Sequence, residues 1–249
     1  MWRISALPCG KVLVSLGDAK FSCSTLLISV HLFVIRCTEY LPTSRQKQDG
    51  SDYAEAMDAQ TVELDTATRI LDVAERLVQQ RGYNAFSYAD VAAELGIKTA
   101  SLHYHFAGKA ALGLALVDRY ATRFQSALQA IDARAPEAAA KLVGYTELYA
   151  EVLRQHRMCL CGMLAADYLT LPEPMRSAVL AFFQHNERWL ALVLSQGAAD
   201  GSLRPTEHPE NSASTLIGAI EGAMLVARAF DDVERFERTA DLILVSLAR

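Results

Sequence analysis

The sequence predicts an all-α protein with two parts, an N-terminal three-helix helix-turn-helix domain and a larger C-terminal helical domain. Three observations carry this prediction. From Leu64 onward the apolar residues recur with the helical period, and this part of the chain shows no turn signals that would pair β-strands. Residues 86–106 read as two short helices that meet at Gly96. Proline and glycine divide residues 125–249 into further helices.

Residues 1–60 do not fit this pattern and are predicted to be a weakly ordered extension without paired strands. The apolar stretch from Leu26 to Val34 is shorter than the roughly 20 residues that span a membrane. No small-residue cleavage site follows it, as one would in a signal peptide. A third interpretation is that translation begins at Met57. We favour it because Met57 leads directly into the first helix.

The first two helices of the helix-turn-helix domain (residues 61–125) are predicted from their apolar stripes and end signals. Gly82 ends the first helix. Ser87 and Asp90 then form a capping signal, because the hydroxyl accepts an orphan backbone N–H and the acid lies near the positive helix end. Gly96 supplies the left-handed residue that ends the second helix. The stripe of the first helix consists of Ala67, Ile70, Leu71, Ala74, Leu77 and Val78.

The third helix is predicted to bury Leu102 and Phe106 and to turn hydrogen-bonding and basic side chains outward. Such a helix suits the major groove of DNA, which admits one helix and exposes the base edges. We expect Ser87 and Lys109 to hold phosphates and the third helix to contact bases or flanking backbone. The candidate DNA-binding residues are Ser87, Lys98, Thr99, Ala100, Ser101, His103, Tyr104, His105 and Lys109.

The following helices are predicted from the same period, with a loop between Gly197 and Pro209. The last two offer more apolar surface than one hairpin can bury. In the first of these two, Gly218 and Gly222 permit close helix approach. The predicted ranges are Lys109–Ile131, Pro136–His156, Leu160–Leu169, Pro174–Gly197, Asn211–Phe230 and Asp232–Leu247.

The charge distribution limits the classes of function. A net charge of −5 argues against a protein that coats nucleic acid without sequence preference. Residues 66–124 hold seven Lys or Arg against five acids, whereas residues 125–249 hold eleven against sixteen. A mildly basic N-terminal part (the head, residues 66–124) and an acidic remainder (the body, residues 125–249) indicate phosphate contact at one end only.

Cysteine spacing and motifs point away from a secreted protein and from an enzyme. The five cysteines show no spacing of a disulfide framework, which is typical of a reducing cytoplasm. The sequence contains no phosphate-binding loop, no serine-nucleophile elbow and no zinc-protease motif. We therefore predict no catalytic residues, no cofactor and no metal.

The helix-turn-helix and its flanks resemble the DNA-binding domain of the TetR (tetracycline-repressor) family. The resemblance runs from about Thr66 to about Phe124, with Arg81-Gly82-Tyr83 before the motif and Gly108-Lys109-Ala110-Ala111-Leu112 after it. It departs at Lys98, where the family usually has a Ser or Thr cap, and at His103, where it usually has Tyr. The resemblance implies a homodimer built on a four-helix bundle, and a ligand pocket in residues 126–249.

Residues 158–176 resemble a branch of this family that includes the repressors of N-ethylmaleimide reductase and of acrylate utilisation. In the former, a reactive cysteine near the start of this helix senses electrophiles, and Cys159 stands at the matching position. We expect the helix dipole, with Arg154, His156 and Arg157, to stabilise the Cys159 thiolate. A thiolate adds to α,β-unsaturated carbonyl compounds or is oxidised.

Three interpretations of this region stay open: covalent sensing at Cys159, a non-covalent ligand pocket, and a purely structural pair of buried cysteines. Asp167 is a candidate polar anchor, and helical aromatics are candidate pocket walls, although most are core. A metal site of Cys159, Cys161 and His156 or His185 is the weakest alternative, because no second matched pair accompanies Cys-x-Cys. The candidate sensor residues are Cys159, Cys161, Tyr145, Tyr149, Asp167, Tyr168, Phe183 and Trp189.

Together these features predict a cytoplasmic, homodimeric transcriptional regulator without a membrane partner. We expect it to bind a short palindromic operator in double-stranded DNA and to be a repressor that a small-molecule or electrophilic inducer releases. An activator would use the same contacts, because promoter position decides. The alternative is an α-helical small-molecule- or metal-binding protein without sequence-specific DNA binding, against which the intact Gly96, Phe106 and Lys109 speak.

Overall fold

A computed structural model describes residues 3–7, 11–16, 19–23, 39–40 and 50–249 of the chain, with side chains from Thr66 onward. The chain divides into two compact units, Met1–Glu63 and Leu64–Arg249, and each is described by itself.

The first unit contains a small antiparallel sheet that the sequence analysis did not expect. Its strands are β1 (Arg3–Leu7), β2 (Lys11–Leu16), β3 (Ala19–Cys23) and β4 (Glu39–Tyr40), in that order across the sheet. The sequence did hold one overlooked signal, because Gly17-Asp18 between two apolar runs is a dipeptide typical of tight hairpins. The start of translation at Met57 stays a prediction.

Helix α1 begins at Gly50, well before the predicted start at Leu64, and ends at Arg81. Residues 51–63 contain Ala, Glu, Gln and Met but neither Gly nor Pro, so nothing local stops the helix from extending toward the N-terminus.

The second unit confirms the all-α fold class, since its regular secondary structure is helical apart from a single bridge between Leu203 and Ala248. Following α1, the helices are α2 (Tyr88–Leu95), α3 (Thr99–His105), α4 (Lys109–Arg134), α5 (Ala138–Arg154), α6 (Leu160–Ala166), the 3₁₀ turn η1 (Tyr168–Thr170), α7 (Glu173–Asp200), α8 (Pro209–Phe230) and α9 (Val233–Leu247).

Two helix ends differ from the prediction for identifiable reasons. The sixth helix stops at Ala166 and continues as the 3₁₀ turn η1 rather than reaching Leu169 as α-helix. Helix α7 runs past Gly197 to Asp200, because the left-handed residue that ends it is Gly201 (φ 80°). Gly197 instead lets Leu203 approach the helix closely, where an added Cβ would collide with that side chain.

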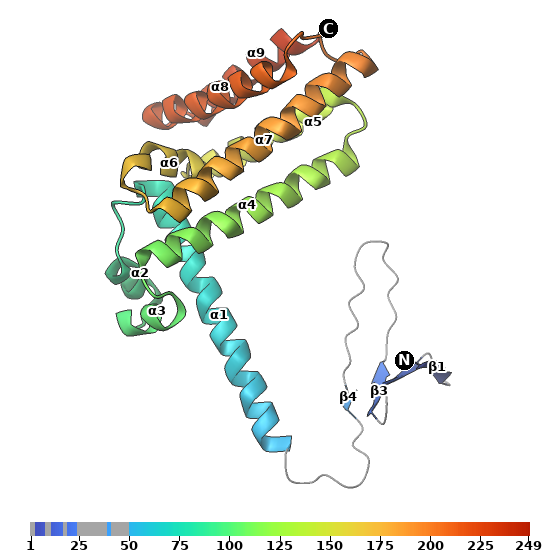
Figure 1. Cartoon of the computed structure of the whole chain (residues 1–249), viewed down its shortest axis with the longest axis vertical. Coiled ribbons are helices and arrows are strands. Elements are labelled where there is room, and N and C mark those ends of the chain that lie inside the picture. Colours follow the sequence, from blue (N-terminus) through green and yellow to red (C-terminus); the bar gives the residue numbers. More distant parts are fainter. Residues whose placement is uncertain (1–2, 8–10, 17–18, 24–38, 41–49) are drawn as a thin grey trace. The chain divides into compact units, whose positions relative to one another are not determined.

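The helices of the second unit pack in layers (Figure 1). Helices α8 and α9 lie together on one side, α4 lies on the other, and α5 and α7 lie between them. Helix α4 runs without a break through residue 125, so the predicted boundary between the two domains falls inside a helix that both share. The largest fully buried side chains include Ile70, Leu102, Leu112, Leu116, Leu128, Leu142, Tyr145, Leu160, Leu164, Met175, Leu190 and Phe236.

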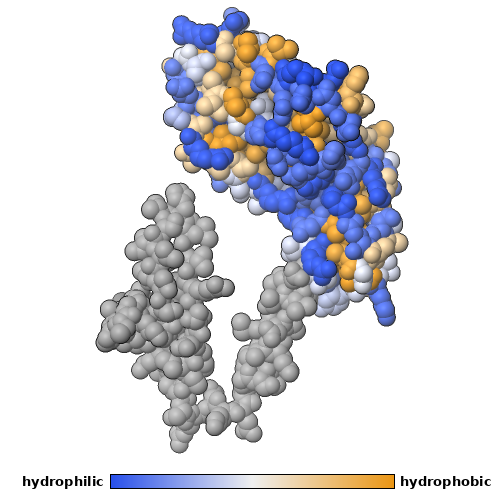
Figure 2. Space-filling model, turned by 180° about the vertical axis from the view of Figure 1, so that it is seen from behind, coloured by the Kyte–Doolittle hydropathy of each residue, from blue (hydrophilic) through white to orange (hydrophobic). Residues whose placement is uncertain are grey.

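The outer face of α8 and α9 carries large apolar side chains that this single chain leaves exposed. In Figure 2 apolar residues reach the surface toward the upper end of the second unit, the end at which Figure 1 shows α8 and α9. Among the helices that the structure describes, only α8 is long and apolar enough to cross a membrane by length and composition, a test that core helices also pass. The exposed residues are Leu225, Val226, Phe230, Leu242 and Val245.

Candidate functional site

The start of α2 is fixed by the capping box that the sequence predicted. Ser87 Oγ accepts a hydrogen bond from Asp90 N at 3.3 Å, and Asp90 Oδ2 accepts one from Ser87 N at 2.7 Å. The Ser87 hydroxyl also donates to Asp90 Oδ2 at 2.6 Å, and these bonds lower the pKa of Asp90. The phosphate contact of Ser87 stays a prediction, and it requires this hydroxyl to turn toward the DNA.

The turn between α2 and α3 sets the angle of α3. Gly96 has φ 67°, and no described atom lies within 4 Å of an added Cβ, so backbone conformation rather than space requires glycine there. Ile97 N donates to Ala92 O at 3.0 Å and closes the end of α2. Lys98 precedes α3 without a side-chain cap, because lysine has no acceptor atom.

Helix α3 buries one face and exposes the other. Leu102 is fully buried and Phe106 is half-buried. The His103 ring lies 4.8 Å from that of Tyr88, and the Tyr104 ring lies 5.2 Å from that of His105. Of the predicted DNA-binding residues on and beside this helix, Lys98, Thr99, Ala100, His103 and Tyr104 are exposed, and Ser101 and His105 are half-buried.

Lys109 begins α4 and reaches back to the preceding connection. Its Nζ donates to Phe86 O at 2.6 Å and lies 4.7 Å and 4.5 Å from the ring centres of Tyr83 and Phe86. Burial lowers the pKa of Lys109, while Asp167 and Asp90 raise it. The ammonium therefore fixes α4 to the segment between α1 and α2, and its predicted phosphate contact would use the remaining donors.

Asp167 caps the turn after α1, while its role as a polar anchor for a ligand stays a prediction. Its Oδ2 accepts hydrogen bonds from Tyr83 N at 2.8 Å and Asn84 N at 3.4 Å. Nearby, Asn84 Nδ2 donates to Thr170 Oγ1 at 2.8 Å. The segment from α6 to η1 is thus attached directly to the connection that carries the helix-turn-helix.

The last carbonyls of α1 are satisfied by groups from the body. Met158 N donates to Gln79 O at 3.2 Å, and Arg228 of α8 donates to Gln79 O at 3.4 Å and to Gln80 O. Arg157 Nη1 reaches Gln79 Oε1 at 3.5 Å. A basic side chain at a helix C-terminus satisfies orphan carbonyls and opposes the negative end of the dipole.

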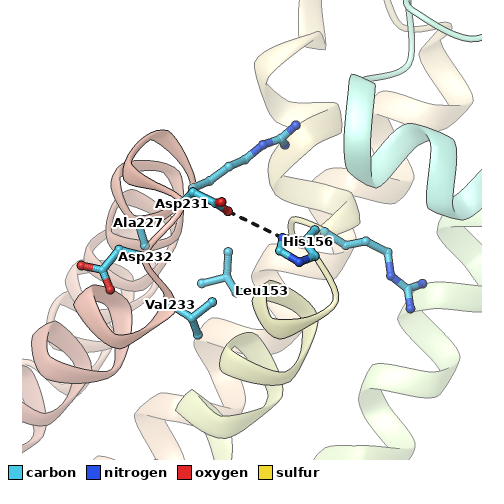
Figure 3. Close-up of a pocket in the computed structure, with 8 residues that line it drawn as sticks. Leu153, His156, Ala227, Asp231, Asp232 and Val233 are labelled. Carbon is cyan, nitrogen blue, oxygen red and sulfur yellow. Dashed lines mark ion pairs between the residues drawn. The ribbon is translucent and has the colours of Figure 1, made fainter.

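A cavity of about 240 Å³ lies between the end of α5 and the α8–α9 turn (Figure 3). His156 and Asp231 face each other there, with Nδ1 and Oδ1 3.6 Å apart, and both have left-handed backbones (φ 54° and 50°). Leu153 and Val233 form apolar parts of its lining.

The cationic surroundings that we expected for Cys159 are therefore absent among the described residues. His156 is paired with Asp231, and Arg157 is directed to Gln79. Arg154 is bonded to Glu147 and Glu237 at the surface. Neither His156 nor His185 forms a possible metal site with Cys159 and Cys161. No group of three or more potential metal ligands occurs in the part of the chain with described side chains.

Cys159 lies in the core as the N-cap of α6. Its Sγ accepts hydrogen bonds from Gly162 N at 3.5 Å and from the Tyr120 hydroxyl at 3.6 Å, and the residue is fully buried. Burial raises the pKa of the thiol well above its usual value, and the nearby Glu221 raises it further. The expected thiolate is thus wrong: desolvation outweighs the helix end, and Cys159 rests as a neutral thiol.

Glu221 of α8 is the residue of this site that the sequence analysis missed. Its Oε2 lies against Gly162, whose N–H donates to Cys159 Sγ, and burial raises the pKa of Glu221 to about 7. Its Oε1 is shielded from solvent and has no hydrogen-bond partner among the described residues. The sequence did contain a signal, because Glu221 is the only charged residue between Glu210 and Arg228 in an apolar helix.

The aromatic candidates divide into a buried group and one outlier. The hydroxyls of Tyr145 and Tyr149 are 2.9 Å apart, and Trp189 stacks on Tyr145 at 5.7 Å with Nε1 donating to Asp132 at 2.9 Å. Phe183 is half-buried beside Phe182, whose ring joins the buried group. Cys161 is buried as well, whereas Tyr168 lies apart, exposed and near Arg176.

Two family models match the chain. Residues 70–116 match the model described as bacterial regulatory proteins, tetR family. Residues 137–243 match the model described as tetracyclin repressor-like, C-terminal domain. The two matches cover the helix-turn-helix and most of the helical body.

Individual relatives agree with these matches. A TetR-family regulator from Agrobacterium tumefaciens has a similar crystal structure, with a TM-score of 0.73, 31% identity, and coverage of 75% of this chain and 100% of that one. The transcriptional regulator AcuR of Cereibacter sphaeroides is 28% identical over 167 residues, which are 64% of this chain and 76% of AcuR. The reduced form of Escherichia coli NemR shares the fold, with a TM-score of 0.64, 24% identity, and coverage of 74% and 97%.

Proposed function

Because this chain belongs to the TetR family of bacterial regulatory proteins, we propose that it is a cytoplasmic, homodimeric repressor released from its operator by a small-molecule or electrophilic inducer. The observation that carries the proposal is α3 itself. A capped α2 and a left-handed Gly96 hold a short helix whose outward row is exposed and rich in hydrogen-bonding side chains. Such a helix reads base edges in the major groove.

Dimerisation through α8 and α9 is supported by their outer face. Gly218 and Gly222 have no described atom within 4 Å of an added Cβ, so a second helix has room to approach there. Leu225 and Leu242 are 62% and 71% exposed on the same pair of helices, which is costly for large apolar side chains in a monomer. Two copies would present two heads to major grooves about 34–36 Å apart on a palindromic site.

A movement of α6 would transmit the effect of the inducer to the helix-turn-helix and so cause release from DNA. This helix begins beside Cys159 in the core and ends beside Asp167, which caps the connection between α1 and α2. A group that enters the core and moves α6 would therefore disturb the support of the head. An inducer acts only if it binds the released arrangement more tightly than the DNA-bound one.

The test is fluorescence anisotropy of the full chain on the DNA just upstream of its own gene, titrated in salt and repeated with methyl vinyl ketone. We expect specific binding that weakens as salt rises and is lost after the electrophile has reacted. Specific binding that withstands the electrophile would point to a non-covalent inducer. If the chain did not bind this DNA specifically and selection from random DNA yielded no preferred sequence either, the function as a regulator would be wrong.

A further inference from the structure

Cys159 is fully buried, and Glu221 is half-buried with its Oε1 shielded from solvent. The two meet at the start of α6, where Gly162 N donates to Cys159 Sγ and the Cα of Gly162 faces Glu221 Oε2. The other titratable side chains whose charges interact with Glu221 or with the two thiols are Tyr120, Tyr145, Tyr149, Cys161 and Glu75. Among the described residues, no lysine, arginine or histidine forms an ion pair with Glu221.

The free oxygen of Glu221 needs an explanation. A shielded carboxyl oxygen without a hydrogen-bond donor lowers the stability of the folded state, so such groups are rare unless they serve a function. Structural stability is a poor account of it, because an apolar residue of similar size would remove that cost.

Gly162 makes room for this pair. An added Cβ at residue 162 would collide with Glu221 Oε2, so glycine leaves the carboxyl group room to lie at the start of α6. The backbone N–H of the same residue donates to Cys159 Sγ at 3.5 Å. The absence of a side chain at one position thus brings a proton acceptor to a thiol.

We propose that Glu221 is the general base for Cys159, and that together they take neutral α,β-unsaturated carbonyl compounds. The inference rests on the proposed function, of which it specifies the inducer class. The Cys159 proton passes to the Glu221 carboxylate while sulfur forms a bond to the β-carbon of the acceptor. The resulting enolate takes the proton back from Glu221 at its α-carbon, so thiol and alkene become a thioether and the carboxylate is restored.

This pairing explains how a thiol that is neutral at rest can still react as a nucleophile. A base that accepts the proton during bond formation removes the need for a preformed thiolate. The lack of a cation beside Glu221 also sets the selectivity. An acceptor with its own carboxylate would meet the charge of Glu221 in a poorly solvated core, whereas a neutral acceptor would not.

The experiment measures the alkylation rate of Cys159 in the full chain by methyl vinyl ketone from pH 5.5 to 10. Peptide mass mapping locates the adduct, because the chain has five cysteines. The variants are Glu221→Gln and the matched control Glu210→Gln, which removes an exposed acid from the same helix. Glu221→Asp keeps the carboxylate and serves if Glu221→Gln does not fold.

We expect Glu221→Gln to slow alkylation at pH 7.5 on the order of 10²-fold, the scale of general-base catalysis. The wild-type rate should rise as Glu221 ionises around pH 7 and then level off. The rate of the variant should rise only where the thiol ionises unaided. It should approach or exceed the wild-type rate near pH 10, since removing the charge of Glu221 eases thiol ionisation. Glu210→Gln should follow the wild type, and Glu221→Asp should retain the rise around neutral pH.

A second arm tests selectivity with acrylamide and acrylate. Relative to their reactivity with glutathione, the wild type should favour acrylamide over acrylate, and Glu221→Gln should reduce this preference. Equal neutral-pH rates and equal pH profiles in wild type and Glu221→Gln would overturn the proposal. A wild-type mass map without an adduct at Cys159 would instead refute covalent sensing, and with it the role of Glu221, whatever the variants do.

Discussion

Glu221 links the stability of the folded chain to pH. Its pKa is about 7 in the folded chain and about 4.3 in an unfolded one. The folded chain therefore holds this proton more tightly, and the stabilisation is complete below pH 4.3 and lost as pH rises through 7. Glu221→Gln should remove about 3 kcal/mol of pH dependence between pH 4.5 and 8, at 1.36 kcal/mol per pKa unit.

Urea unfolding of wild type and Glu221→Gln at pH 5 and pH 8 measures this difference, and other titrating groups cancel in the comparison. The variant should gain stability relative to wild type as pH rises. Parallel loss of stability in both proteins would place the titrating group elsewhere.

Lys109 has a second role that structure adds to the predicted one. Lys109→Ala should weaken binding to all DNA sequences and lower the salt slope by about 0.9, the loss of one phosphate contact. It should also lower the melting temperature, because the bond to Phe86 O and the two ring contacts disappear. Lys98→Ala is the matched control, since Lys98 is exposed beside α3 and should affect DNA affinity without a change in melting temperature.

The distance along the chain between two contacting residues decides whether the sequence could predict their contact. The capping box of Ser87 and Asp90 and the turn at Gly96 depend on neighbours within four residues, so local patterns predicted them. Asp167 caps a backbone N–H 84 residues away, and Lys109 bonds a carbonyl 23 residues away. No period or motif encodes such partners. Glu221 was missed for the same reason, since a lone acid in an apolar helix does not say what faces it.

At the scale of elements, α6 is a short link between the core and the head. Asp167→Ala should free the N–H groups of Tyr83 and Asn84 and cost about 1–2 kcal/mol in stability. Operator affinity should fall, because the connection that orients α2 and α3 loses its cap. Hydrogen exchange at residues 83–84 together with DNA anisotropy checks this. Asp200→Ala is a control that removes a comparable carboxylate cap from α5, away from the helix-turn-helix.

Helix boundaries follow the same logic as single residues. The core-facing period located every helix of the second unit, but the ends of the sixth and seventh depended on tertiary contacts. Gly197 looked like a terminator, yet its task is to accommodate Leu203. The strands of the first unit were missed because the Gly17-Asp18 signal was overlooked, and the early start of α1 was missed because residues 51–63 lack a clear apolar period.

At the scale of the whole molecule, the exposed face of α8 and α9 should determine the oligomeric state. Leu242→Arg should shift the protein from dimer toward monomer in sedimentation and weaken operator binding, because one head then binds without its partner. Leu192→Arg is the matched control: it lies on α7 with the same 71% exposure and should leave the dimer intact. A dimer unchanged by Leu242→Arg would locate the interface on another face.

The contact between Gly162 and Glu221 also constrains how this protein has diversified. A substitution that adds even one carbon at residue 162 displaces the carboxyl group of Glu221. With a shorter or neutral residue at 221, the carboxyl group no longer requires glycine at 162. The two positions should therefore change together among relatives, although 59 residues separate them in the chain. Lineages that keep both would share one inducer chemistry, and lineages that lost both would have been free to adopt another on the same scaffold.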